Sequence, residues 1–422
     1  MTSRERVTLA LNHREPDRVP IDMGSSVTSG IMVTTYAKLR KALGVNGTPP
    51  RVSDLLQMLA EVEAPVLEKL GCDVVGIIPL VRSFGIANKD WKPWRTFDGT
   101  DVLAPGQFNY RVDDSGDLLI SPGGDVSKPP SGRMPKDGYY FDIIVRQQPI
   151  DWDHLDPAEF AEQFGRLSDS ELAYIGASAE NYHRNTGFAI LGGFGGGGLG
   201  DLPRVLAPEM EAPKGIRNFD DWMVAHLTHP EYIKEIFARQ TERAIENLEL
   251  YRQAVGSKIV AIFISGTDFG TQRQEFISPD MYREFYLPFH KRMNDWVHEH
   301  TTWKTFYHCC GSIYHLIPSF IEAGVDILNP VQCSAANMEP ERLKREFGDR
   351  IVFWGGAVDT QKTLPFGTPE EVRREVAERI RVFAPGGGFV LNSIHNIQAK
   401  TPVENVLAMF ETARSAGRYP IK

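Results

Sequence analysis

Three of the chain's four cysteines and two of its histidines fall in one stretch, residues 304–334, KTFYHCCGSIYHLIPSFIEAGVDILNPVQCS. His308 ends an apolar run, and Cys310 follows two residues later. In extended backbone, residues i and i+2 point the same way, so these two side chains converge while Cys309 points elsewhere. An imidazole and a thiolate together suit Zn²⁺. The spacing therefore predicts a metal site, with ordinary packing of the same two residues as the alternative.

A zinc ion needs at least one more protein ligand, and a distant segment offers it. His395 follows a later apolar run, in GGGFVLNSIHNIQAKTP. Three protein ligands with a fourth position open form the arrangement of a catalytic zinc site, not of a structural one. We therefore predict His308, Cys310 and His395 as metal ligands.

Asp268, in SGTDFGTQ, follows the apolar run VAIFI. A carboxylate there can move a proton or orient a metal-bound group, so Asp268 and His308 are the candidate catalytic residues. The alternative for Asp268 is an Asx turn or a helix cap, which is common for Asp close to Gly. Polar side chains that follow other apolar runs are predicted to bind the substrate: Asn329, Gln332, Asp359, Asn392 and Gln398.

Two other motifs point to different chemistry. Cys309 and Cys333 could form a redox pair, but the chain has no C-x-x-C, and adjacent cysteines make a poor disulfide. The run GGFGGGGLGD, residues 192–201, contains a formal G-x-G-x-x-G. Without a clear surrounding βαβ unit, this run is weak evidence for dinucleotide binding and equally fits a flexible loop.

Eight short β-like runs alternate with helical patterns along the chain, which is typical of a parallel sheet with helices outside it. The runs are 18–23, 72–80, 187–191, 259–264, 305–308, 325–328, 351–354 and 388–391. This alternation predicts a single (β/α)₈ TIM barrel over residues 1–422, with a β-rich insertion at 91–150. In such barrels the working residues follow the carboxyl ends of the strands, where all the candidates above lie.

The composition narrows the class of function. The net charge of −9 argues against a nucleic-acid partner. The chain has no apolar run near the ~20 residues of a membrane span, and its amino terminus lacks the apolar core of a secretory signal. We therefore expect a cytoplasmic protein, with no membrane contact, that acts on a small molecule.

Four segments together resemble the uroporphyrinogen decarboxylase superfamily. They are SRERVTLALNHREPDRVPID, SGTDFGTQ with FISPDMYREFYLPFHKR, FYHCCGSIYHLIPSFIEAGVDILNPVQ, and the tail FWGGAVDTQKTLPFGTPEEVRREV with GGGFVLNSIHNIQ and TPVENVLAM. The resemblance implies a (β/α)₈ barrel with its site at the carboxyl mouth. True uroporphyrinogen decarboxylases carry an arginine-rich segment after the first strand, whose cations hold the substrate carboxylates. The matching stretch here, VPIDMGSSVTSG, contains no arginine.

The resemblance is greater to the zinc-dependent, cobalamin-linked methyltransferases of this superfamily. Their H-x-C-G motif is matched by His308, Cys310 and Gly311, and their T-P-x-E-N helix by TPVEN from Thr401. Their third ligand is a cysteine, where this chain has His395. An imidazole in place of a thiolate makes the site one charge more positive and a stronger Lewis acid.

The resemblance implies a methyltransferase that uses Zn²⁺ to move a methyl group between a small ether, amine or thiol and cobalamin. The chain lacks a D-x-H-x-x-G corrinoid motif, so the cobalamin would sit on a separate corrinoid protein. A metal-free decarboxylase of a tetrapyrrole or another carboxylated ring is the alternative enzyme. The third alternative is a binding or chaperone-like barrel for a corrinoid or tetrapyrrole, without turnover. A homodimer is a further possible assembly.

Overall fold

The computed structural model describes residues 1–421, and its centre is a curled sheet of seven parallel strands in the order β17-β16-β15-β14-β13-β12-β3. These strands are β3 (Val74–Ile77), β12 (Ala189–Gly193), β13 (Ala261–Ser265), β14 (Lys304–His308), β15 (Ile327–Asn329), β16 (Val352–Trp354) and β17 (Phe389–Val390). Ile21 lies between the two sheet edges: it forms a parallel bridge with Leu391, and its carbonyl accepts the N–H of Asp73 at 2.7 Å. The ring is thereby closed, and the predicted (β/α)₈ barrel is confirmed.

The first β-like run, 18–23, forms this bridge in place of a regular strand. Pro20 has no N–H to donate to a neighbouring strand, although its carbonyl accepts the N–H of Leu391 at 2.8 Å. The eighth position of the barrel is therefore occupied by a very short piece of extended chain.

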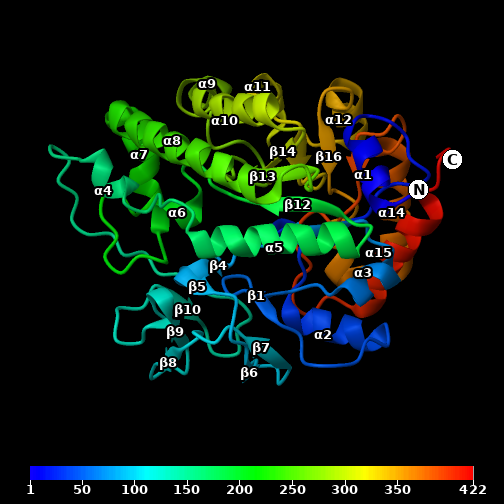
Figure 1. Ribbon diagram of the computed structural model, residues 1–422, viewed down its shortest axis with the longest axis horizontal. Coiled ribbons are helices and arrows are strands. Elements are labelled where there is room, and N and C mark those ends of the chain that lie inside the picture. Colours follow the sequence, from blue (N-terminus) through cyan, green and yellow to red (C-terminus); the bar gives the residue numbers. More distant parts are fainter. Residues whose placement is uncertain (422) are drawn as a thin grey trace.

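Helices surround the barrel (Figure 1). They are α1 (Ser3–Leu11), α2 (Val33–Ala42), α3 (Ala64–Leu70), α4 (Pro157–Ala161), α5 (Asp169–Asn185), α6 (Leu202–Leu206), α7 (Phe219–Thr228), α8 (Pro230–Val255), α9 (Pro279–Phe285), α10 (Leu287–His300), α11 (Ile317–Glu322), α12 (Pro340–Phe347), α13 (Thr363–Phe366), α14 (Pro369–Phe383) and α15 (Val403–Ala416). Within residues 1–421, no helix combines the length and the apolar character that crossing a membrane requires.

Helix α14 illustrates why these segments fold as they do. Thr368 and Glu371 form a capping box at its start, which satisfies backbone N–H groups that have no partner inside the helix. Its buried residues, Val372, Val376, Ile380 and Phe383, recur every three or four positions and so lie on one face. That face packs against α15 and α12.

Helix α1 closes the amino-terminal end of the barrel. It contacts β3, β12 and β17, and Val7 and Leu11 join the cluster of inward-facing strand residues that includes Phe306 and Trp354. Both α1 residues are almost fully buried. The barrel interior is thus packed at this end.

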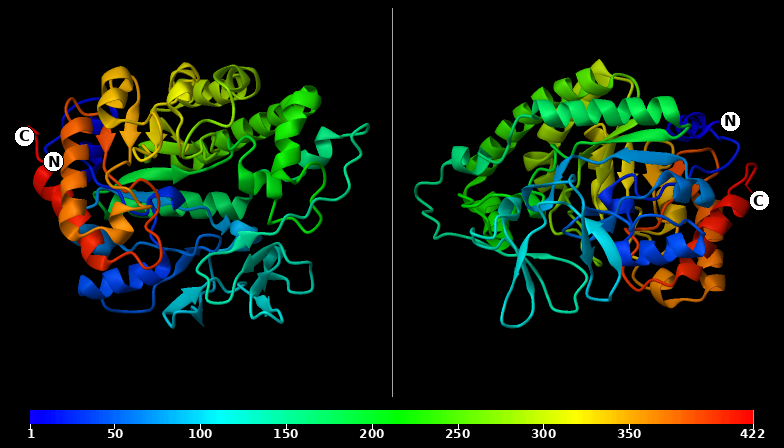
Figure 2. Two further views of the ribbon diagram at one scale, coloured as in Figure 1. Left: turned by 180° about the vertical axis from the view of Figure 1, so that it is seen from behind. Right: turned by 60° about the horizontal axis from the view of Figure 1, so that its bottom comes forward.

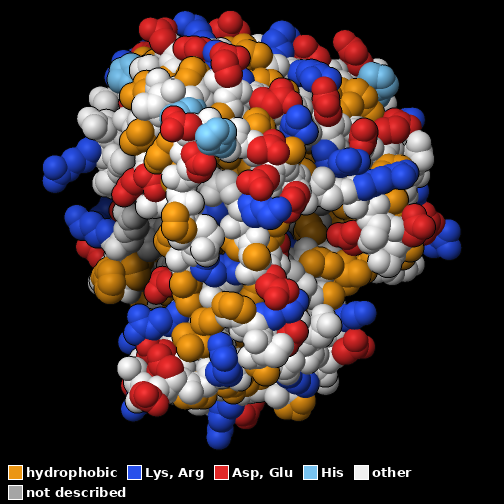
Figure 3. Space-filling view, turned by 90° about the vertical axis from the view of Figure 1, so that its left-hand side faces the viewer, with side chains coloured by type: hydrophobic (Ala, Val, Ile, Leu, Met, Phe, Trp, Pro, Cys, Tyr) orange, Lys and Arg blue, Asp and Glu red, His pale blue; other side chains and the backbone are white. Residues whose placement is uncertain are grey.

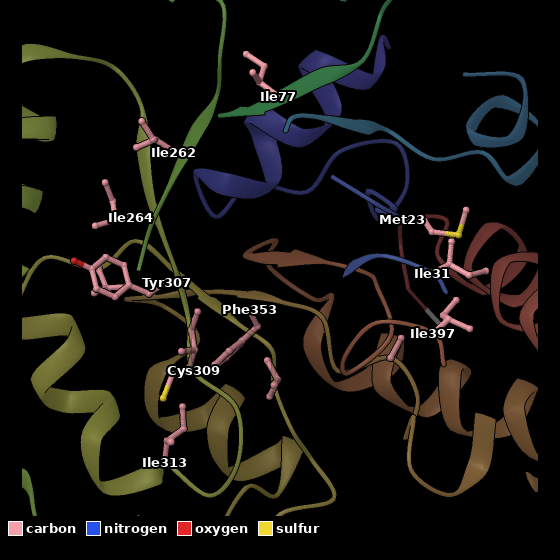
Figure 4. Packing of buried hydrophobic residues seen from close by; sticks show 14 of the residues in the cluster. Met23, Ile31, Ile77, Ile262, Ile264, Tyr307, Cys309, Ile313, Phe353 and Ile397 are labelled. Carbon is pink, nitrogen blue, oxygen red and sulfur yellow. The ribbon is translucent and has the colours of Figure 1, made fainter. Parts of the chain in front are cut away.

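A second apolar layer separates the strands from the helices. Figure 4 shows outward-facing strand residues such as Ile262, Ile264, Tyr307 and Phe353 in this layer. Cys309 lies there too, 2% exposed, and its sulfur accepts the N–H of Phe269 at 3.2 Å. The expectation that Cys309 points away from the interior agrees with this placement.

A group of short antiparallel strands follows β3 and forms a separate layer on one side of the barrel (Figures 1 and 2). The strands are β4 (Val81–Arg82), β5 (Ile86–Ala87), β6 (Lys92–Arg95), β7 (Asp101–Ala104), β8 (Tyr110–Val112), β9 (Leu118–Ile120), β10 (Gly132–Met134) and β11 (Asp142–Ile143). The hairpin of β1 (Val52–Asp54) and β2 (Leu59–Ala60) lies next to them, because Leu56 accepts the N–H of Phe141 at 3.0 Å. Tyr140 accepts the N–H of Ala399 at 3.1 Å, which ties this layer to the loop that carries His395.

His226, in α7, provides a test of the packing. Burial lowers its pKa from 6.5 to about 4, and its Nε2 lies 2.9 Å from the hydroxyl of Tyr286. The unfolded chain binds the proton of this imidazole more readily than the folded chain does. The contribution of neutral His226 to stability is therefore fully present above pH 6.5 and is lost as the pH falls towards 4. We expect His226 to lower the free energy of unfolding by about 1.4 kcal/mol for each unit by which the pH falls in that window.

Urea denaturation at pH 7, 6 and 5 measures this slope. His226→Gln should reduce it, whereas His154→Gln, which changes an exposed histidine, should leave it as in the native chain. An equal slope in both variants would show that His226 does not control it.

Candidate active site

The candidate residues gather at the carboxyl ends of the strands. Along β14, Phe306 joins the inner cluster and Tyr307 the outer layer, so His308 faces the barrel interior. Figure 3 looks at this end of the molecule and shows the surface hollowed between the barrel and the β-rich layer. The site therefore lies at the barrel mouth.

Three side chains from two neighbouring loops converge there. One ligand atom each of Asp268, His308 and Cys310 lies within 4.8 Å of the other two. Asp268 Oδ1 accepts the backbone N–H of Cys310 at 2.6 Å and lies 3.6 Å from His308 Nε2. The carboxylate of Asp268 thus binds a neighbouring loop instead of capping its own turn.

The donor set fits a zinc ion. Carboxylate oxygen, imidazole nitrogen and thiolate sulfur are the three ligand types that zinc takes in proteins. His308 is 4% exposed. Its Nε2 lies 3.6 Å from the carboxylate of Asp268, which is too far for a hydrogen bond. A cation between these atoms would satisfy all three groups.

His395 lies beside this group but outside it. The centroids of the His308 and His395 rings are 5.4 Å apart, with their planes at 71°. Burial, and secondly the nearby His308, lower the pKa of His395 to about 4, so its imidazole is neutral at neutral pH. The structure therefore adds Asp268 to the group around His308 and Cys310, and it places the predicted ligand His395 beside His308.

Burial also controls the protonation of the acidic groups. It raises the pKa of the Cys310 thiol well above its ordinary value, and the charge of Asp268 adds to this effect. A metal that binds this sulfur would therefore displace a proton. Asp201, at the end of the glycine-rich run, has its pKa raised to about 7 by burial and by the same Asp268 charge.

Four of the five predicted substrate-binding residues divide into two groups. Asn329 and Gln332 lie beside the converging residues: Asn329 Oδ1 is 2.8 Å from His308 Nδ1, and Gln332 Oε1 accepts the N–H of Gly311 at 2.8 Å. Asp359 and Gln398 bond within their own loops, to the N–H of Gln361 at 2.8 Å and to the carbonyl of Asn396 at 3.3 Å.

Asn392 differs from these residues. It is 1% exposed, and neither its amide nitrogen nor its amide oxygen has a hydrogen-bond partner within residues 1–421. It follows Val390, an inner-cluster residue, by two positions, so it also faces the interior. A buried amide without partners costs stability unless a ligand or water binds it.

Sequence reasoning did not single out Asp22, Thr28 or Asp201. Asp22 is 1% exposed, accepts the indole N–H of Trp354 at 3.0 Å, and has its pKa raised by burial. The sequence could have identified Asp22 as a candidate, because this carboxylate ends the apolar run VPID on the first segment of the barrel. Asp201 has a similar signal, since it ends the loop that follows β12.

The alternative motifs do not form the sites that they suggested. In the glycine-rich loop, the N–H of Gly195 binds the carbonyl of Phe263 at 2.7 Å and that of Gly197 binds Ile264 at 3.0 Å. The loop thus folds onto β13, and the helix that follows has only five residues. All four cysteines are free thiols.

The chain is similar to known proteins over most of its length. The family described as Uroporphyrinogen decarboxylase (URO-D) matches residues 147–416. A uroporphyrinogen decarboxylase of Prochlorococcus marinus (strain NATL2A) is 25% identical over 286 residues, which cover 67% of this chain and 75% of that one. The chloroplastic uroporphyrinogen decarboxylase 2 of Oryza sativa is 25% identical over 278 residues, 65% of each chain.

Among solved structures, a methyltransferase from Methanosarcina mazei has the same fold. The two chains align over 98% of their lengths with a TM-score of 0.56 and 16% sequence identity. At this identity the likeness concerns the fold. It extends over the whole chain, including the segment before residue 147.

Proposed function

This chain belongs to the uroporphyrinogen decarboxylase (URO-D) family, and from that premise we propose that it is a zinc-dependent methyltransferase. It would move a methyl group between a small ether, amine or thiol and the cobalt of a separate corrinoid protein. The observation that carries the proposal is the convergence of Asp268, His308 and Cys310 at the barrel mouth. As the sequence predicts, the enzyme would act in the cytoplasm.

The proposed roles follow from the contacts. His308 and Cys310 would hold the zinc, with Asp268 or His395 as the third ligand. The zinc would act as a Lewis acid on the heteroatom that carries or receives the methyl group. Whichever of Asp268 and His395 is not a ligand would exchange a proton with that heteroatom.

The charge at the mouth favours a small substrate over a porphyrinogen. The stretch VPIDMGSSVTSG, which corresponds to the arginine-rich segment of true uroporphyrinogen decarboxylases, contains the carboxyl group of Asp22 and no arginine. Arg82 lines the same small cavity as Gly24 and Ser26 of this stretch, but its guanidinium binds Asp54 at 2.9 Å. A substrate with several carboxylates needs unengaged cations, because charge-assisted hydrogen bonds hold such groups.

The test is the metal content and the reaction together. Chain purified without a metal-affinity tag should contain about one zinc, since the donor set is that of a single site. With a reduced corrinoid protein, it should methylate the cobalt from methylated phenols or thiols, and a chelator should abolish the reaction. Full activity in chain that contains no metal would contradict the proposal.

One observation favours a second candidate, a metal-free decarboxylase. Burial and the charge of Asp268 raise the pKa of Asp201 to about 7. This pKa suits a general acid at neutral pH. Decarboxylation of a porphyrinogen, unaffected by chelators and reduced in Asp201→Asn, would support this candidate and remove the first.

We expect Asn392 to contribute to substrate binding. Asn392→Leu keeps the approximate volume but removes an amide whose two polar atoms lack protein partners, so KM should rise about tenfold, as for the loss of one or two hydrogen bonds. The turnover number should change less, and the zinc content should not change. Steady-state kinetics measure both constants, with Asn294→Leu, a buried asparagine on α10, as the control. An unchanged KM would show that the amide does not contact the substrate.

A further inference from the structure

Asn329 ends β15, and its fully buried amide makes three hydrogen bonds. Its Nδ2 donates to the carbonyl of Trp354 at 2.8 Å. Its Oδ1 accepts from the hydroxyl of Thr28 at 2.8 Å and lies 2.8 Å from Nδ1 of His308. Every polar atom of this side chain is therefore engaged.

The contact with Trp354 determines the orientation of the Asn329 amide, that is, which side its nitrogen and its oxygen face. A carbonyl oxygen only accepts hydrogen bonds, so the atom that faces it must be the NH₂ group of Asn329. The oxygen of the amide then faces His308, and only a protonated Nδ1 can donate to it. In a neutral imidazole, one ring nitrogen carries the proton and the other a lone pair. The lone pair of His308 is thus on Nε2.

That lone pair lies where the candidate ligands converge. Nε2 is 3.6 Å from Asp268 Oδ1, in the group that includes Cys310. We propose that Asn329, held in place by Thr28, is the positioning residue that keeps the proton on His308 Nδ1 and directs the Nε2 lone pair at the metal. This inference rests on the proposed metal site. Such outer partners of a ligating histidine fix its tautomer and ring orientation.

The hydroxyl of Thr28 belongs to a chain of hydrogen bonds on the first loop of the barrel. Thr28 is on the short helix η1 (Val27–Ser29), and its Oγ1 lies 2.9 Å from the hydroxyl of Ser26. Since Thr28 donates to Asn329, it can accept from Ser26. The carbonyl of Val27 accepts from Asn396 at 3.3 Å, which joins η1 to the segment of His395. Thr28 can therefore be changed to test the arrangement without altering Asn329.

The experiment combines a metal titration with a direct measurement of the tautomer. Zinc affinity is measured by competition with a chromophoric chelator, and the ring nitrogens of His308 are observed by NMR in metal-free, ¹⁵N-histidine-labelled chain at pH 8. The signals are assigned by their loss in His308→Gln. The variants are Asn329→Leu, Asn329→Asp and Thr28→Val, with Asn294→Leu as the matched buried control.

We expect Nδ1 to be protonated in the native chain. Asn329→Leu should lose this preference and bind zinc about 10–100-fold more weakly. Asn329→Asp keeps an acceptor for Nδ1 and should retain most of the native zinc affinity. Thr28→Val should bind zinc about two- to tenfold more weakly than the native chain. Asn294→Leu should bind zinc as the native chain does.

Two results would overturn the inference. One is a native His308 protonated on Nε2, and the other is an Asn329→Leu variant that keeps both the tautomer and the zinc affinity. If Asn329→Leu does not fold, Thr28→Val decides by the same two readouts. A native chain that binds no zinc but has Nδ1 protonated would remove the proposed function, while the control of the tautomer by Asn329 would stand.

Discussion

Cys310→Ala should lose its zinc and with it the methyl transfer. The sulfur is one of three ligand atoms that lie within 4.8 Å of one another, and alanine supplies no donor. The affinity should fall by more than the roughly 100-fold that the loss of an outer partner can cost. Elemental analysis and the rate of cobalt methylation measure the two effects. Burial raises the pKa of this thiol, so the native chain should release a proton when zinc binds.

Two comparisons make this prediction specific. Cys333→Ala, which changes a partly buried thiol elsewhere in the chain, should retain both zinc and activity. Asp268→Asn and His395→Ala distinguish the third ligand, because the variant that loses more zinc identifies it. A Cys310→Ala chain with full zinc content and full rate would show that the sulfur is not a ligand.

Asp73→Ala should lower the free energy of unfolding by about 3–5 kcal/mol, because it removes a buried carboxylate that two guanidinium groups share. The side chain of Asp73 is fully buried and binds Arg6 at 2.6 Å and Arg18 at 2.7 Å. Its Oδ2 also accepts the N–H of Ile21 at 2.9 Å, so one carboxylate joins α1, the first barrel segment and the start of β3. Chemical denaturation monitored by circular dichroism measures the loss.

Asp17 provides the comparison for Asp73. It also binds Arg6, at 2.7 Å, but its side chain is 46% exposed, so Asp17→Ala should cost no more than about 1 kcal/mol. Equal losses in the two variants would mean that burial of the Asp73 carboxylate does not determine its contribution.

The barrel could be predicted from the sequence because its signals are local. Each strand is a short apolar run, buried on both sides, and helical periodicity separates one run from the next. The convergence of His308 and Cys310 is local as well, since it needs only the two-residue period of extended chain. Pro20 was the visible reason why the first run could not pair as fully as the others.

The rest of the site depends on contacts between distant parts of the chain. Asp268 meets Cys310 across 42 residues, and Thr28 meets Asn329 across 301. Periodicity does not reveal such pairs, so the contact of Asp268 with the loop of Cys310 could not be predicted, although the sequence placed Asp268 and His395 at the same end of the barrel. Asn329 was predicted to bind substrate because it follows a strand, but position alone does not show that its amide is already bonded to Trp354 and Thr28.

The closure of the barrel by α1 has a kinetic consequence. With the amino-terminal end packed by Val7 and Leu11, the opening beside the candidate residues is the mouth at the carboxyl ends of the strands. In the proposed reaction, the small substrate and the partner's cobalt must approach through that same opening. A docked partner would then block loading and release of the small molecule, so the proposed reaction would follow a compulsory order, and excess partner protein would slow turnover by occupying the mouth before the substrate does.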